Sequence, residues 1–180
     1  MAPGLLLQGR TAPSNLGRVR VSGRGDPARV YLRGDEWGSG GVHFLPVRRN
    51  VWEVDVAEDR PMTLRLNTAF VDGELALETI EVTRVDLDGA FNDFTLSLSV
   101  PHTDTRVNLE GAFNRLELVV PEGTPVRVST DGFLNLVDRR FITRNPTGPA
   151  YQLRSEGAFN RIVIRSSEPL VADRVLTPTR

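Results

Sequence analysis

The stretch Val85-Asp86-Leu87-Asp88-Gly89-Ala90-Phe91-Asn92-Asp93-Phe94-Thr95-Leu96-Ser97-Leu98 decides the fold of this chain. Apolar and polar residues alternate before and after its central Gly-Ala-Phe-Asn tetrapeptide. Residues two apart lie on the same face of a strand, so each half of the stretch predicts a half-buried strand. The small residues at its centre predict a bend or bulge where neighbouring backbones approach closely.

The tetrapeptide belongs to a repeat. Gly-Ala-Phe-Asn occurs three times, at 89–92, 111–114 and 157–160, and two degenerate copies lie at 68–71 and 131–134. The phenylalanines of the five copies follow one another in steps of 21, 22, 20 and 26 residues and are Phe70, Phe91, Phe113, Phe133 and Phe159. Self-similarity at about 20 residues is typical of stacked rungs that bury their apolar faces against one another. The chain is long enough for roughly eight such rungs.

The same alternation recurs along most of the chain, and no stretch longer than a turn or two has the 3.6-residue spacing of a helix. The sequence therefore predicts an all-β fold, a single-stranded β-solenoid or β-helix-like stack of rungs about 20 residues long. We expect 50–166 to form the regular rungs. We expect 1–49 to form degenerate rungs or a cap of the same solenoid, and 167–180 to form a C-terminal cap or tail.

A residue that recurs once per rung predicts a ladder along the stack. We expect the five phenylalanines to stack into an internal ladder, and the asparagines beside them to form a second, hydrogen-bonded ladder. The asparagines of this predicted ladder are Asn92, Asn114, Asn135 and Asn160.

Composition excludes several classes of function. The chain has 22 basic and 23 acidic residues and a formal net charge of −1, which argues against nucleic-acid binding as its main role. The absence of cysteine excludes disulfides, thiolate catalysis and cysteine-bound metals. No apolar run is long enough for a membrane helix, and the N-terminal apolar patch is too short for a signal peptide. We therefore expect a cytoplasmic protein without direct membrane insertion, or one associated with the envelope through a partner.

Candidate catalytic and metal-binding residues are few. His43 and His102 are the only histidines, and neither belongs to a recognisable metal spacing or nucleophile motif. The acids of 86–93 resemble the start of a calcium loop but lack its final glutamate, and they alternate as a strand does. The Arg-Gly-Asp tripeptide at 24–26 is an adhesion motif, although Gly-Asp-Pro is also ordinary turn chemistry. We predict no catalytic residue, no metal and no cofactor, and hence no enzyme.

A basic and aromatic cluster lies in the longest step of the repeat, between Phe133 and Phe159. Insertions between rungs form loops, and arginine and aromatic residues are enriched at protein interfaces. We predict that this cluster binds a partner, with a buried aromatic among solvated arginines as the alternative. Its members are Arg139, Arg140, Phe141, Arg144 and Tyr151.

Two stretches carry a family resemblance. The tandem units begin at Leu64-Arg65-Leu66-Asn67-Thr68-Ala69-Phe70, and Leu116-Glu117-Leu118-Val119-Val120-Pro121-Glu122-Gly123-Thr124-Pro125-Val126-Arg127-Val128 contains a Pro-x-Gly turn between strands. From about residue 50 to 166 the chain is similar to the toastrack class of bacterial β-solenoids. This class includes the C-terminal domain of LiaF-like envelope-stress proteins and the related "putative adhesin" family. The resemblance implies a single-chain solenoid without a catalytic motif.

These observations favour a non-enzymatic β-solenoid interaction scaffold, in bacterial envelope-stress response or regulation. The first alternative is a self-assembling structural element like the bactofilins, whose rungs stack end to end through open edges. The second is an adhesin-like surface module. In all three, the expected partner is a protein or a second copy of this chain.

Overall fold

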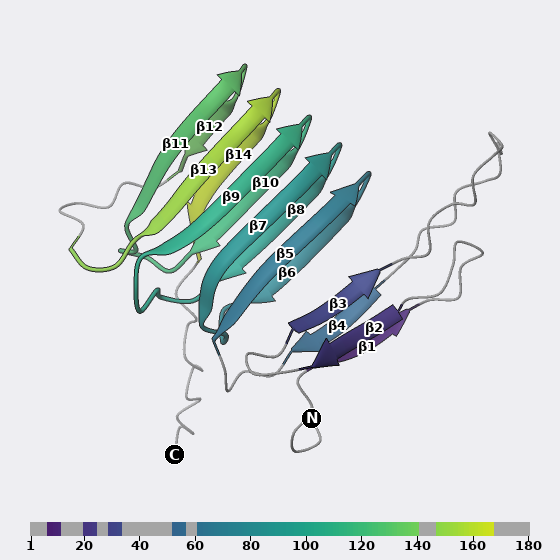
Figure 1. Cartoon of the computed structure of the whole chain (residues 1–180). Helices are drawn as coiled ribbons and strands as arrows, with labels where there is room; N and C mark the ends of the chain where they lie inside the picture. The colour runs from purple at the N-terminus through teal and green to yellow at the C-terminus, as the bar shows by residue number, and fades with distance from the viewer. Residues whose placement is uncertain are drawn as a thin grey trace, which may run out of the picture. The chain divides into compact units, whose positions relative to one another are not determined.

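The structure is a computed structural model that describes residues 7–11, 20–24, 29–33, 52–56, 61–140 and 147–167. The chain divides into two compact units, Met1–Ala57 and Glu58–Arg180. The second unit contains the parallel strands drawn in blue to yellow in Figure 1.

The described strands of the first unit form two small antiparallel pairs. Strand β1 (Leu7–Thr11) pairs with β4 (Trp52–Val56), and β2 (Arg20–Arg24) pairs with β3 (Arg29–Arg33). All the strand pairs described in this unit are antiparallel. That the segment 1–49 forms degenerate rungs or a cap of the solenoid stays a prediction.

The second unit is a β-solenoid, as the alternation and the repeat predicted. It has two five-stranded sheets in which all strand pairs are parallel, and the described residues contain no helix. The first sheet consists of β5 (Met62–Ala69), β7 (Val82–Ala90), β9 (Thr105–Ala112), β11 (Val126–Phe133) and β13 (Tyr151–Ala158). The second consists of β6 (Asp72–Leu77), β8 (Asp93–Leu98), β10 (Arg115–Val120), β12 (Leu136–Arg139) and β14 (Arg161–Ser166).

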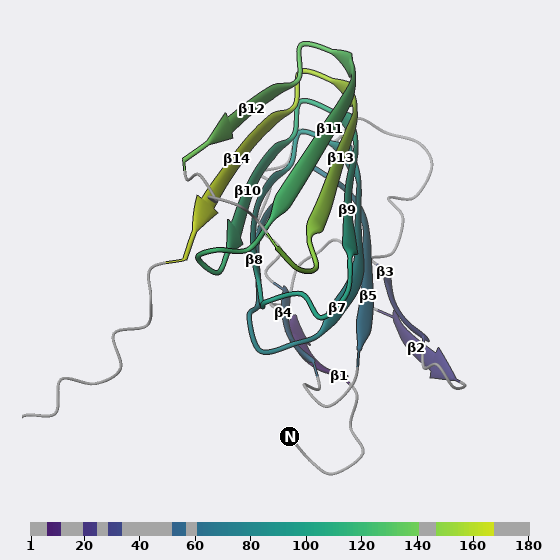
Figure 2. The same cartoon turned by 90° about the vertical axis from the view of Figure 1, so that its left-hand side faces the viewer.

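Each repeat contributes one strand to each sheet and bends between them. The pairs β5–β6, β7–β8, β9–β10, β11–β12 and β13–β14 are the first to fifth repeats in chain order. Figure 2 shows the two sheets joined along the bends and separating toward the other ends of the strands. The described chain thus has five repeats rather than the eight that its length allowed.

The repeats do not stack in chain order. The first sheet has the order β11-β13-β9-β7-β5 and the second has β12-β14-β10-β8-β6. The fifth repeat therefore lies between the third and the fourth, and the fourth repeat is at the end of the stack. The longest step of the repeat, from Phe133 to Phe159, contains the connection that makes this exchange possible.

Inward side chains explain which repeat takes the terminal position. Ile164 of the fifth repeat is 1% exposed, and its register partner in the fourth repeat is Arg139. An arginine without a partner is costly inside an apolar core. At the end of the stack Arg139 is exposed instead, while the fifth repeat fills the interior. The buried aliphatic side chains of the core include Leu87, Leu96, Leu98, Leu109, Leu116, Leu118, Leu153 and Ile162.

Candidate interaction site: an exposed phenylalanine ladder

Glycine begins the bend in four of the five repeats, where the backbones of neighbouring repeats approach very closely. Gly111 has a φ of 114°, and a Cβ added to it would lie 1.8 Å from the carbonyl oxygen of Gly89. The corresponding distance for Gly157 is 1.9 Å, to the carbonyl oxygen of Gly111. No side chain fits at such a distance, so the glycine of the tetrapeptide is required by the stacking.

The asparagine of the tetrapeptide points into the solenoid and connects neighbouring repeats. The side-chain amide of Asn114 donates to the carbonyl oxygen of Gly89 at 3.0 Å, and its Oδ1 accepts the backbone N–H of Asn92 at 3.2 Å. Asn160 repeats this arrangement, because its amide donates to Gly111 and its Oδ1 accepts the N–H of Asn114. Asn92, Asn114 and Asn160 are all buried, and Asn135 accepts the N–H of Asn160 at the end of the stack.

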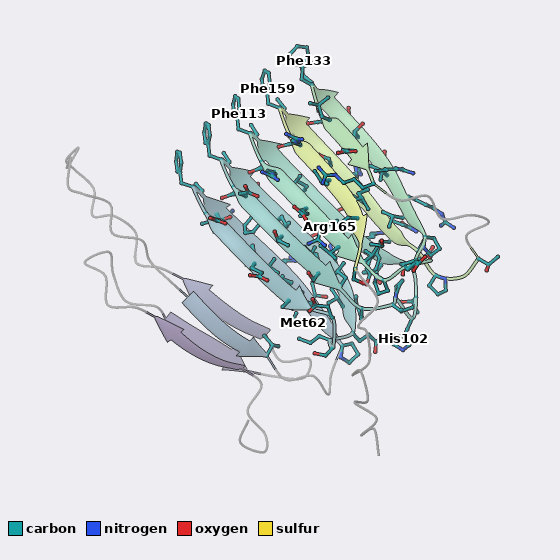
Figure 3. All side chains as sticks on the ribbon, turned by 180° about the vertical axis from the view of Figure 1, so that it is seen from behind. Met62, His102, Phe113, Phe133, Phe159 and Arg165 are labelled. Atoms are coloured by element: carbon teal, nitrogen blue, oxygen red, sulfur yellow. The ribbon has the colours of Figure 1, made fainter. Side chains whose placement is uncertain are left out.

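The phenylalanines form a ladder, but it lies on the outside of the molecule. Phe91, Phe113 and Phe159 have φ angles of 58°, and this left-handed conformation at the bend turns the ring outward while the following asparagine points inward. Figure 3 shows the rings of Phe113 and Phe159 projecting from the bend. The expectation of an internal ladder was wrong because alternation does not continue through a residue in this conformation.

Four of the five rings stack face to face along the bends. The centroids of Phe70 and Phe91 are 5.0 Å apart, those of Phe91 and Phe113 are 5.0 Å apart, and those of Phe113 and Phe159 are 4.9 Å apart. The planes within each pair differ by at most 5°. Even so, the exposed fractions of these side chains range from 44% for Phe159 to 78% for Phe70.

Phe133 joins the ladder differently. It pairs in register with Ala158 and so lies one residue earlier in its repeat than the other four phenylalanines. Leu134, the next residue, has the positive φ of this bend. The ring of Phe133 packs edge-on against Phe159 with centroids 5.7 Å apart, and it is 63% exposed. The phenylalanine ladder, defined as Phe70, Phe91, Phe113, Phe159 and Phe133 in spatial order, is thus an apolar ridge open to solvent.

The three described members of the predicted binding cluster, Arg139, Arg140 and Tyr151, differ in their exposure. Tyr151 is fully buried in the core and its hydroxyl donates to the carbonyl oxygen of Ser99 at 2.8 Å, so it is not available to a partner. Burial raises the pKa of Tyr151 to about 12. Arg139 and Arg140 are exposed, and the Arg140 side chain pairs with Asp138 at 3.2 Å. Phe141 and Arg144 lie outside the described residues.

The acids that resembled a calcium loop do not converge. Asp86 accepts hydrogen bonds from Arg84 and Asn108, whereas Asn92 belongs to the buried asparagine ladder. Burial by itself would raise the pKa of Asp86, but these hydrogen bonds and the charges of Arg84 and Arg65 lower it below its usual value. Asp86 therefore serves to connect strands of the first sheet.

The acid beside His102 also has a structural role. Asp104 accepts the backbone N–H of Ala150 at 2.9 Å and the side-chain amide of Gln152 at 3.0 Å, and the hydrogen bond from Ala150 lowers its pKa. His102 is exposed near the strand ends opposite to the phenylalanine ladder (Figure 3). His43 and most of the Arg-Gly-Asp turn lie outside the described residues.

The described residues contain neither a metal-ligand cluster nor a membrane-spanning helix. No three His, Asp or Glu side chains there are grouped in a way that could hold a metal ion. Nor does that part of the chain include a helix with the length and apolar character needed to cross a membrane.

Comparison with known proteins supports the fold. No family model matches the sequence, and no curated protein is similar to it. The structure is similar to the crystal structure of "a putative cell adhesion protein" from Clostridium sporogenes ATCC 15579, with a TM-score of 0.73 and 14% sequence identity. The similarity covers 90% of this chain and 83% of the other one. The chain is thus a β-solenoid of a kind that is found in a solved structure.

Proposed function

We propose that this protein is a non-enzymatic scaffold that binds a protein partner through the phenylalanine ladder. The observation that carries the proposal is the exposure of five phenylalanine side chains in one continuous row. Contiguous apolar surface on a folded protein marks interaction sites, and stacked rings that are already ordered lose little conformational entropy on binding.

The setting of this function follows the resemblance to toastrack domains. On that basis the partner belongs to an envelope-stress or regulatory assembly of a bacterium. An adhesin-like surface module is the second candidate, and the description of the similar Clostridium protein as "a putative cell adhesion protein" favours it. In both settings the partner binds to the same phenylalanine ladder.

Self-assembly like that of bactofilins is less compatible with the fourth repeat, which ends the stack. Strands β11 and β12 have no further described strand on their outer side, and Leu136 and Val137 of β12 are exposed there. However, Arg139 occupies an inward position in the same strand. Stacking another copy on this edge would bury the charge of Arg139. Inward-pointing charged residues are one way in which edge strands avoid pairing with another chain.

The test is affinity capture from native cells with the wild-type protein and the double variant Phe91→Asn, Phe113→Asn. Asparagine tolerates the left-handed conformation of these positions, so the double variant removes the rings without straining the bend. The matched control is Val100→Ser, which removes an exposed apolar side chain away from the ladder.

We expect a partner that the wild type and the control retain, and that the double variant loses while its circular dichroism spectrum is unchanged. Retention of every captured protein by the folded double variant would contradict the proposal.

A further inference from the structure

A row of carboxylates accompanies the phenylalanine ladder on the outward face of the first sheet. An acid immediately precedes the bend glycine in four of the five repeats. The strand register brings these acids side by side in the spatial order Asp88, Glu110, Glu156 and Asp131. Neighbouring members are separated by about one strand spacing of 4.8 Å. We call these four residues the acidic row.

The acidic row is only partly neutralised within the part of the chain that the structure describes. Glu156 is paired with Arg154 of its own strand, and Asp88 accepts a long hydrogen bond of 3.4 Å from Asn67. Among the described residues no cation is paired with Asp88, Glu110 or Asp131. Like charges on directly opposite strand positions repel each other, so a cation at this face would relieve an unfavourable arrangement.

Arginines occupy outward positions toward the far ends of the same strands. Four positions earlier in the same strands, the outward side chains include Arg84, Arg106 and Arg127. Arg84 and Arg127 are each paired with an acid, so their charge is largely compensated, whereas three members of the acidic row have no paired cation among the described residues. The other flank of the ladder, on the second sheet, is mixed, because its first row contains Asp72, Asp93, Arg115, Arg161 and Leu136.

We propose that the phenylalanine ladder and the acidic row form one docking surface for a cationic segment with apolar side chains. This inference rests on the proposed function and adds the chemistry of the partner. The segment lies along the stack, with apolar side chains on the rings and lysine or arginine side chains on the acidic row. Five repeats span about 20 Å, which corresponds to about six residues of an extended chain.

Both halves of this surface are needed for selective binding. The rings supply apolar area that is removed from water, whereas the carboxylates select the charge of the partner and accelerate its approach. Exposed ion pairs contribute little individually, so the acidic row acts through its several members. Binding through this surface becomes weaker as salt is added, because the charges are exposed and screened.

The experiment measures binding of the full chain to three synthetic peptides by fluorescence anisotropy. One peptide alternates arginine and leucine, the second alternates glutamate and leucine, and the third alternates arginine and serine. We expect binding of the arginine–leucine peptide alone, and weaker binding in 500 mM than in 50 mM NaCl. Equal binding of the glutamate–leucine peptide would overturn the charge argument.

Two variants with the same change of net charge locate the site. The variant Asp88→Asn, Glu110→Gln, Asp131→Asn neutralises the acidic row, and we expect it to bind the arginine–leucine peptide about tenfold more weakly. The control Glu78→Gln, Glu81→Gln, Glu122→Gln neutralises three acids in turns at the opposite strand ends, and we expect unchanged affinity. Equal weakening by both variants would mean that the peptide responds only to net charge, which would overturn the proposal.

The outcomes also separate this inference from the proposed function. If the acidic-row variant still captures the native partner while the double phenylalanine variant does not, the ladder binds a partner of another chemistry and this inference fails alone. If neither variant loses the partner, both proposals fail. Concentration-dependent association of the wild type that the double phenylalanine variant abolishes would make a second copy the occupant, which also overturns the inference.

Discussion

Removal of one asparagine from the interior of the stack is the sharpest test of how the bends are stabilised. In Asn114→Ala three hydrogen bonds are lost: the two that Oδ1 accepts from the backbone and side-chain amides of Asn92, at 3.2 and 3.1 Å, and the one donated to Gly89 at 3.0 Å. Asn114 is 2% exposed, so water cannot replace these bonds. At 1 to 1.5 kcal/mol for each partner left without a bond, we expect a loss of about 3–5 kcal/mol in the free energy of unfolding.

The matched control is Asn135→Ala at the end of the stack. Asn135 accepts the N–H of Asn160 at 3.2 Å and donates to the backbone carbonyl oxygens of Asp131 at 2.9 Å and Gly157 at 3.3 Å. It is only half-buried, so water can take over part of these interactions. We expect a loss of about 1 kcal/mol. Urea unfolding followed by circular dichroism measures both values. The account of the asparagine ladder would be refuted if the two variants lost the same stability, or if Asn114→Ala lost less than about 1 kcal/mol.

Three further predictions concern the bend, the core tyrosine and the open edge. Gly111→Ala should prevent folding of the solenoid, as judged by circular dichroism, whereas Gly123→Ala, with φ 81° and no atom near the added Cβ, should cost about 1 kcal/mol. In a Tyr31→Phe background the absorbance at 295 nm should report Tyr151 alone, with an apparent pKa near 12; a value near 10 would contradict its burial. Since this folded-state pKa is higher than the unfolded one, the resulting stabilisation is complete below about pH 10 and is lost as the pH rises toward 12. Arg139→Ile should cause concentration-dependent association in sedimentation velocity, and no change relative to wild type would exclude its role in blocking the edge.

The sequence was sufficient to predict the solenoid because the burial of every second side chain requires apolar and polar residues to alternate along each strand. It was not sufficient to predict the stacking order, because all the repeats present similar strands and any neighbour would pair with any other. Two features of the sequence relate to the exchange of the fourth and fifth repeats: Arg139 at an inward position, and the long step before Phe159. The sequence analysis interpreted the long step as a binding insertion. Tyr151 was assigned to that insertion for the same reason, although it begins a core strand.

The site was predicted only in part. The repeat identified the residues of the phenylalanine ladder, but apolar character suggested burial, and only the positive φ of the bend places the rings outside. The acidic row was missed even though its trace is simple, since Asp88, Glu110, Asp131 and Glu156 each precede a glycine of the repeat. Only the strand register shows that these acids are neighbours on one surface.

Three residues of the tetrapeptide have separable roles, and this separation favours a function for the rings. Gly111 permits the close approach of the repeats and Asn114 connects them inside the stack, so the fold depends on both. Phe113 fills a left-handed position that asparagine or glycine would occupy at lower conformational energy, by about 1 kcal/mol or more. Stacking on two neighbouring rings offsets that cost, because two pairs at about 0.5–1.5 kcal/mol each supply about 1–3 kcal/mol. Folding alone therefore gains at most about 2 kcal/mol from phenylalanine at this position. A partner that covers the rings gains in addition the burial of surface that the fold leaves exposed.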